Sequence, residues 1–175
     1  NNEINEPDYF KVPQENWWTA LRSFAWETIK VVVISLAIIV PVRLFLIQPF
    51  YVKGASMEPN FFDNEYLIID EISYRFAEPE RGDIVVFRYP RKPSNFFIKR
   101  VVGLPGETVH VADSTVTIFN EENPDGFILD ESGYLSPGTI TTGDVDTVLE
   151  GNEYFVLGDN RASSLDSRVF GPVLD

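Results

Sequence analysis

Hydrophobic and polar positions divide the chain into two regions of different texture. From Ile29 to Phe50 the residues are almost continuously apolar, with only two charged side chains among them. About 20 consecutive apolar residues are enough for a helix to cross the hydrocarbon core of a bilayer. The pattern therefore predicts a transmembrane anchor over residues 29–49, preceded by an acidic N-terminal tail and membrane-interface segment over residues 1–28.

Two other structures could also explain the apolar run: a buried core helix and a cleavable signal peptide. A signal peptide needs a small-x-small cleavage site soon after its apolar core, and "PVRLFLIQPFYV" offers none. Trp17, Trp18 and Trp26 lie upstream of the run, where aromatic side chains are typical of a membrane interface. Cations slightly favour the N-terminal side, which predicts a single pass with the N-terminus in the cytoplasm and the rest outside.

After residue 50 the pattern changes to short β-branched and aromatic runs separated by turn residues. Examples are "YLIIDEI", "GDIVVFRY", "FFIKRVVG", "STVTIF" and "NEYFVLGD". Such runs predict strands, and we expect an all-β domain over residues 50–175. Within it, residues 111–150 are more acidic and rich in turn residues, which indicates an inserted hairpin segment.

Composition and charge restrict the chemistry. The chain carries 14 Lys and Arg against 27 Asp and Glu, a formal net charge of -13, which argues against a nucleic-acid partner. It has no Cys, so thiol nucleophiles and Cys/His zinc sites are excluded, and neither a metal nor another cofactor is predicted. His110 is the single His, so a Ser-His-Asp triad would have to use it.

A serine flanked by small residues follows the apolar run, in "VKGASMEPNF" at residues 52–61. Small neighbours are common in loops. They also allow a peptide backbone to approach a nucleophile closely. Ser56 is therefore a candidate nucleophile.

Two adjacent cations occupy the apolar stretch "FFIKRVVG", residues 96–103. In a strand, Lys99 and Arg100 lie on opposite faces, so one of them must border apolar surroundings. Arg keeps its proton in proteins, whereas a desolvated Lys can become a neutral general base for a serine hydroxyl. The alternative is an exposed sheet on which both cations extend their ends into solvent.

A third polar cluster lies in "LGDNRASSLDSRVFGPV", residues 157–173. Asp159, Arg161, Asp166 and Arg168 could form an ion-pair network that fixes this loop. Asp159 and Asp166 could instead share a proton, as in an aspartic-type mechanism. Each has an Arg nearby in sequence, which would lower its pKa and oppose proton sharing.

Taken together and in this order, "SMEP", "RGDIVVFRYP…FIKRVVGLPGE" and "GDNRASSLDSR" resemble the type I signal peptidases, which are membrane-anchored Ser-Lys endopeptidases. The resemblance implies that Ser56 is the nucleophile, that Lys99 is its general base and that Ser164 orients the lysine amine. Asp159, Asp166 and Arg168 would be supporting residues. The implied fold is mainly β: an N-terminal transmembrane helix, then coiled antiparallel sheets with an inserted β-ribbon, which residues 111–150 fit.

The resemblance also implies a substrate and partners. The enzyme would remove signal peptides from exported preproteins at the outer surface of the cell membrane, cutting after small-x-small sequences such as Ala-x-Ala. Its partners would be preproteins and the lipid bilayer. The implied substrate-binding residues are Tyr51, Val52, Gly54, Ala55, Met57, Phe96, Phe97 and Ile98, of which Met57, Phe97 and Ile98 would line a pocket for Ala.

Two positions depart from the pattern of the resembled family. Gly54 stands where some members place a Ser or Thr hydroxyl near the oxyanion, so that the oxyanion must rely on backbone N–H groups. Asn60 stands where threonine is more frequent. Two other functions remain open: a self-cleaving Ser-Lys repressor-type protease, and an inactive membrane-anchored β-domain that binds a partner.

Overall fold

A computed structural model describes residues 16–45, 48–70 and 76–174. The chain divides into two units, Asn1–Phe45 and Leu46–Asp175, and we refer to the second as the β unit. The predicted acidic tail lies mostly outside the described residues.

The first unit contains one long helix, α1 (Trp17–Phe45). It begins where the carbonyl of Asn16 accepts the N–H groups of Thr19 and Ala20, well before the predicted start at residue 29. Residues 17–42 are long and apolar enough to cross a membrane. The described large apolar side chains of α1 are exposed, as expected of a segment that contacts lipid.

The predicted anchor extends past the end of the helix. Gln48 and Pro49, which we assigned to the anchor, belong instead to strand β1 (Gln48–Tyr51). Hydropathy alone could not separate the two elements, because the apolar run continues into this strand. β1 pairs with β2 (Tyr66–Ile69) in a two-stranded antiparallel sheet.

The rest of the β unit consists mainly of two four-stranded antiparallel sheets, as the predicted fold class requires. The first has the strand order β10-β9-β4-β3 and comprises β3 (Ile84–Arg88), β4 (Phe96–Gly103), β9 (Glu153–Leu157) and β10 (Val173–Leu174). The second has the order β7-β6-β5-β8 and comprises β5 (Thr108–Ala112), β6 (Thr115–Phe119), β7 (Phe127–Ile128) and β8 (Val145–Val148). Two short helices follow β9: the 3-10 helix η2 (Arg161–Ser163) and α2 (Ser167–Phe170).

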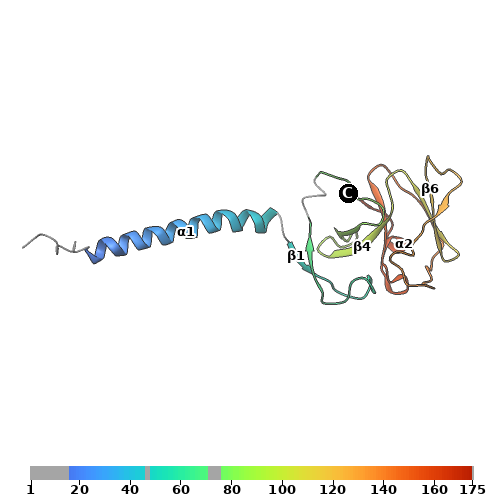
Figure 1. Ribbon diagram of the computed structural model, residues 1–175. Coiled ribbons are helices and arrows are strands. Elements are labelled where there is room, and N and C mark those ends of the chain that lie inside the picture. The colour runs from blue at the N-terminus through green and yellow to red at the C-terminus, as the bar shows by residue number, and fades with distance from the viewer. Residues whose placement is uncertain (1–15, 46–47, 71–75, 175) are drawn as a thin grey trace, which may run out of the picture. The chain divides into compact units, whose positions relative to one another are not determined.

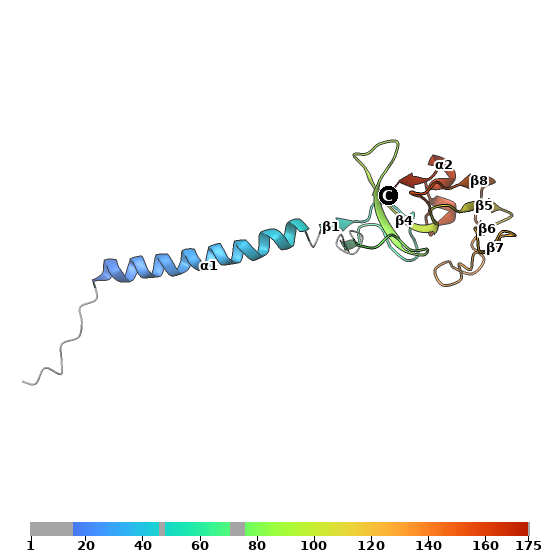
Figure 2. The same cartoon turned by 90° about the horizontal axis from the view of Figure 1, so that it is seen from above.

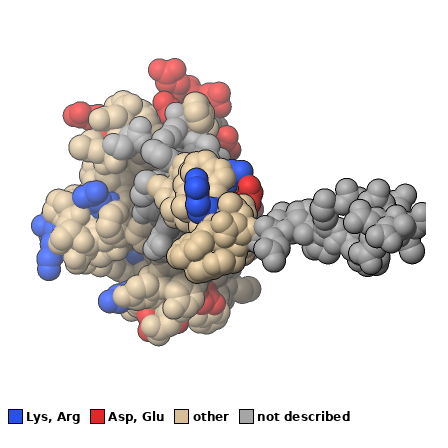
Figure 3. Space-filling view, turned by 90° about the vertical axis from the view of Figure 1, so that its left-hand side faces the viewer, with Lys and Arg blue, Asp and Glu red and all other residues tan. Residues whose placement is uncertain are grey.

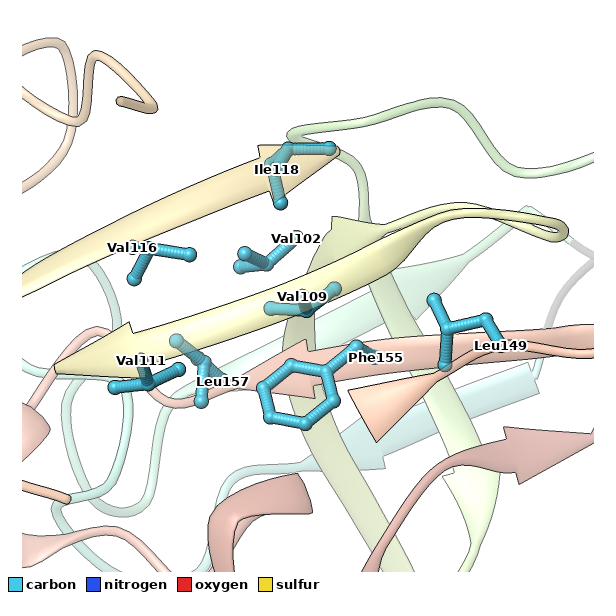
Figure 4. Packing of buried hydrophobic residues seen from close by; sticks show 8 residues of the cluster. All are labelled: Val102, Val109, Val111, Val116, Ile118, Leu149, Phe155 and Leu157. Carbon is cyan, nitrogen blue, oxygen red and sulfur yellow. The ribbon is translucent and has the colours of Figure 1, made fainter. Parts of the chain in front are cut away.

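One hydrophobic core joins these two sheets (Figure 4). Val102, Phe155 and Leu157 come from the first sheet and pack against apolar side chains of β5 and β6. Gly103 allows this close packing, because a Cβ there would overlap the side chain of Val109. Residues 111–150 therefore share the core of the β unit, and their sheet already begins at Thr108.

The arrangement of the strands places β4 centrally. In both ribbon views β1 and β6 lie at opposite ends of the β unit, with β4 between them (Figures 1 and 2). On the face drawn in Figure 3, acidic side chains gather mainly at the upper edge of the unit and basic ones at the left. The site described next is assembled around β4.

Candidate active site

Ser56 lies in a tight turn that follows β1. Gly54 adopts a positive φ of 90°, and its N–H donates to Asp63 Oδ1 at 2.7 Å. The carbonyl of Met57 accepts the N–H groups of Asn60 at 2.9 Å and Phe61 at 3.0 Å, and the Met57 side chain is fully buried. This turn thus holds Ser56 against the body of the β unit.

Lys99 reaches the same point from β4. Its Nζ donates to Ser56 Oγ at 2.7 Å and to the carbonyl of Ile98 at 2.8 Å. Lys99 is only 3% exposed. Burial lowers the pKa of its amine from 10.5 to about 8, although the negative charges of Asp166 and Asp159 oppose the shift. A lysine with this pKa is partly neutral near pH 8 and can accept a proton there.

The segment after β9 fixes the other side of the Ser56 turn. Asn160 donates from its backbone N–H to the Ser56 carbonyl at 3.0 Å and from Nδ2 to the Ala55 carbonyl at 2.9 Å. Gly158 packs so closely that a Cβ would overlap both Ser164 Oγ and the Ser56 carbonyl oxygen. Glycine is therefore needed at position 158.

Arg100, the neighbour of Lys99, is also buried, at 8% exposure. Its guanidinium donates to Asp159 twice, from Nε at 2.8 Å and from Nη2 at 2.7 Å, and to the carbonyl of Gly82 at 2.7 Å. The sequence predicted apolar surroundings for only one of the two cations. Both are enclosed. The arginine is neutralised by the carboxylate of Asp159, whereas the amine of Lys99 donates to a hydroxyl and a carbonyl.

The predicted ion-pair network within residues 159–168 forms only in part. Arg168 donates to Asp166 as expected, from Nη2 at 2.8 Å. Asp159 pairs with Arg100, and Arg161 pairs with Glu131 of the predicted insert. The partners of Asp159 and Arg161 are therefore residues distant in sequence, which the folding of the chain brings to them.

No shared-proton pair of aspartates is present among these residues. Burial raises the pKa of Asp166, but the hydrogen bond and charge of Arg168 outweigh this effect, and the pKa lies below its ordinary value. Asp159 accepts two hydrogen bonds from Arg100. Both carboxylates are therefore bound to guanidinium groups, which disfavours the aspartic-type mechanism.

Ser164 Oγ is buried and makes no hydrogen bond of normal geometry within the described part of the chain. It lies beside Gly158 and close enough to Asp166 to help lower the pKa of that carboxyl. The amine of Lys99 donates to Ser56 and Ile98 instead. The role of Ser164 in orienting Lys99 stays a prediction.

The predicted substrate-binding residues differ in exposure. Tyr51 and Phe96 are about half exposed, at 53% and 49%, whereas Val52 and Met57 are buried. Gly54 is exposed, and Ala55, Phe97 and Ile98 are half-buried. The Phe97 ring stacks on Tyr89, with 4.5 Å between centroids. Strand β9 pairs with β4 from Arg100 onward and does not pair with residues 96–99.

A cavity of about 1060 Å³ lies elsewhere in the β unit. Its lining comes from β2, β3, β9 and β10 and includes Leu67, Ile84 and Tyr154. None of the predicted substrate-binding residues lines it. The pocket for a small side chain, formed by Met57, Phe97 and Ile98, therefore stays a prediction.

His110 has no part in this arrangement. It lies on β5, and its Nδ1 is 2.6 Å from Asp146 Oδ1 on the neighbouring strand β8. Within residues 16–45, 48–70 and 76–174, no group of three or more His, Asp or Glu side chains is placed to hold a metal ion.

Sequence reasoning missed several residues around the site. Asn60 Nδ2 donates to Asp159 Oδ2 at 2.7 Å and to the carbonyl of Tyr134 at 2.8 Å. The ring of Tyr134 lies 4.1 Å from the Arg100 guanidinium carbon, and Thr141 accepts a hydrogen bond from Arg161. The only sequence signal was that Asn60 departs from the usual motif, since the other contacts join residues far apart in the chain.

Comparisons with known proteins identify the family of this chain. The family described as "Signal peptidase, peptidase S26" matches residues 25–175. The chain is 38% identical over 164 residues to a probable signal peptidase I-2 of Synechocystis sp., covering 91% of this chain and 68% of that protein. It is 33% identical over 152 residues to signal peptidase I of Bacillus licheniformis, covering 86% and 81%.

Among solved structures, a signal peptidase I from Enterococcus faecalis is 35% identical, with a TM-score of 0.45, covering 56% of this chain and 91% of that one. The family match and the identity to the full-length relatives decide the assignment. The chain belongs to the signal peptidase family, peptidase S26, and is a serine endopeptidase.

Proposed function

We propose that this enzyme removes N-terminal signal peptides from exported preproteins by Ser-Lys dyad catalysis, with Ser56 as nucleophile and Lys99 as general base. The observation that carries the proposal is the 2.7 Å contact between Lys99 Nζ and Ser56 Oγ. This distance is within hydrogen-bond reach, the first requirement for a general base. The lowered pKa of Lys99 meets the second requirement.

The chemistry proceeds in two balanced halves. Neutral Lys99 takes the proton of Ser56 Oγ as the oxygen attacks the scissile carbonyl, and the resulting ammonium returns a proton to the leaving amine. An ester then links Ser56 to the signal peptide. In the second half Lys99 takes a proton from water, the hydroxide attacks the ester, and Ser56 recovers its proton as the signal peptide leaves.

The turn that contains Ser56 could supply the hydrogen-bond donor that stabilises the oxyanion. Position 54 has no hydroxyl, so the backbone N–H of Ser56 is the candidate donor to the oxyanion. Gly54 gives its own N–H to Asp63, which fixes the turn in the conformation that exposes Ser56 Oγ to Lys99. Residues 96–99 of β4, which β9 does not pair with, could form backbone hydrogen bonds with an extended substrate.

Specificity and location follow from the same proposal. A half-buried apolar wall that includes Ile98 would accept Ala at the position before the cut and reject large side chains.

The apolar helix α1 anchors the enzyme, with its N-terminus in the cytoplasm and the β unit on the outer face. Protease added to spheroplasts should then degrade the β unit, and its protection would contradict this orientation.

The test of function is cleavage of a preprotein by the full chain purified in detergent. We expect one cut after an Ala-x-Ala sequence, identified by mass spectrometry, and none with Ser56→Ala. Ser23→Ala is the matched control, because Ser23 is exposed on α1 and its hydroxyl donates to the carbonyl of Ala20 in the same helix. Full activity of Ser56→Ala would refute the assignment of Ser56 as the nucleophile. If a substrate with Leu before the cut is cleaved as fast as one with Ala, only the prediction of a pocket for a small side chain is refuted.

A further inference from the structure

Asn60 holds two parts of the β unit together through a single nitrogen. Its Nδ2 carries two hydrogens, and both are used, one on Asp159 Oδ2 and one on the carbonyl of Tyr134. A threonine at this position has one donor hydrogen and could satisfy only one of these acceptors. The asparagine therefore connects two acceptors that a threonine could not connect.

The bond from Asn60 to the Tyr134 carbonyl connects it to a loop, residues 131–134, that is itself held by hydrogen bonds. Tyr134 lies between β7 and β8, and its hydroxyl donates to Glu131 Oε1 at 2.6 Å. Burial and Glu131 together raise the pKa of this hydroxyl, so it remains a donor at every relevant pH. Glu131 also accepts from Nη1 of the buried Arg161 at 2.9 Å. The loop segment 131–134 is thus fixed to the strand β9 side of the core.

The same loop covers the ion pair next to the catalytic lysine. The Tyr134 ring lies over the Arg100 guanidinium, 4.1 Å from its central carbon, and Arg100 is adjacent to Lys99 on β4. Asp159 accepts from both Arg100 and Asn60. The contacts therefore close a ring: the Ser56 turn, Asn60, the 131–134 loop, Arg100 and back to Lys99.

We propose that Asn60 and Tyr134 are positioning residues, through which the 131–134 loop sets the Ser56 turn against Lys99. The inference rests on the proposed function, since it concerns how the nucleophile and base are aligned. Neither residue touches the reacting atoms. Their effect passes through the turn that contains Ser56 and through the Asp159–Arg100 pair. The 131–134 loop, which belongs to the predicted insert, is therefore part of the catalytic framework.

The test compares Asn60→Thr, Asn60→Ala, Tyr134→Ala and the Asn60→Thr/Tyr134→Ala double variant in the full chain, with Asn152→Thr as control. Asn152 is exposed and lies outside the network, so the control makes the same change of side chain elsewhere. Rate constants are measured in single turnovers with a saturating excess of enzyme over substrate, so that they do not depend on the fraction of correctly folded enzyme. We expect each single variant to lose about 10-fold in this rate, because small misplacements at a nucleophile are costly. KM should change little. The double variant should have about the same rate constant as the slower single variant, because both residues act through one network.

A second measurement separates positioning from loss of folded protein. Loosening the turn admits water to Lys99, which weakens the desolvation that lowers its pKa, while Asp159 and Asp166 continue to raise it. The rising limb of the kcat/KM profile should therefore move to higher pH in Asn60→Thr. Loss of folded enzyme alone would lower the profile without moving it.

Three outcomes would overturn the proposal. One is single-turnover rate constants within about two-fold of wild type in both Asn60→Thr and Tyr134→Ala. The second is a loss in Asn60→Ala that Asn60→Thr fully restores, because the bond to Asp159 would then suffice without Tyr134. The third is a reduced rate with an unmoved pH profile. If Ser56→Ala itself stays active, the proposed function fails instead, so the two failures are distinguishable.

Discussion

Replacing Lys99 by methionine should make the protein more stable at pH 7, although it destroys activity. Methionine is unbranched like lysine but one atom shorter, so the change removes the buried amine. Lys99 is 3% exposed, and its pKa is about 8 in the folded state, against 10.5 as its ordinary value. Because the folded pKa is the lower one, the unfolded chain binds more protons between these values. Stability therefore rises with pH across this window.

The size of the effect follows from the pKa difference. At pH 7 the lysine is charged in both states, and keeping that charge in the folded protein costs about 3 kcal/mol. Two hydrogen bonds of Lys99 would be lost, worth about 2 kcal/mol together, so the net gain at pH 7 is about 1 kcal/mol. By pH 9.5 the cost of the charge falls by about 2 kcal/mol, and the variant should become less stable than wild type.

The assay is urea unfolding of both proteins in the same detergent, followed by tyrosine circular dichroism. The three tryptophans all lie in α1 and would not report on the β unit. Subtracting the two free energies of unfolding at each pH removes the contribution of every other titrating group. A difference that stays constant from pH 7 to 9.5 would refute the argument that burial lowers the pKa of Lys99.

Three further predictions concern activity and stability. The kcat/KM of the wild type should rise with pH through a pKa of about 8, set by Lys99 in the free enzyme, and a limb near 10.5 in a titration from pH 6 to 11 would contradict it. Arg161→Leu should lower the free energy of unfolding by about 3–5 kcal/mol, because it leaves Glu131 unpaired in a largely buried site; an unchanged urea midpoint would be the contrary result. Gly158→Ala should lower kcat/KM by about 100-fold, because the new Cβ would displace the Ser56 carbonyl, and near-normal rates would show that the backbone adapts.

Some of this arrangement could be predicted from sequence, because it depends on local patterns. The small residues around Ser56 and the enclosed Lys99 stand out in short stretches, and the alternation of apolar runs predicts the strands. The end of the helix could not be placed, since the predicted apolar run Ile29–Phe50 extends beyond α1 and into β1. A hydropathy pattern records burial or lipid contact and does not distinguish a helix from a strand over a few residues.

The ion pairs show the other limit. Arg100 and Asp159 are 59 residues apart, and the partner of Arg161 lies 30 residues before it. Antiparallel pairing of β4 with β9 brings the first pair together, and no local spacing encodes that register. Asn60 appeared in the sequence only as a departure from a motif, and its two acceptors become visible only in the folded chain.

The central claim is that a neutral lysine activates the serine, and Lys99→Arg tests it most directly. Arginine retains the positive charge on a slightly longer side chain, but it cannot give up a proton to become a base. Purified wild type, Ser56→Ala and Lys99→Arg should be compared on one preprotein across pH 6 to 11. We predict that Lys99→Arg cleaves no faster than Ser56→Ala at any pH, and substantial cleavage by Lys99→Arg would contradict the Ser-Lys mechanism.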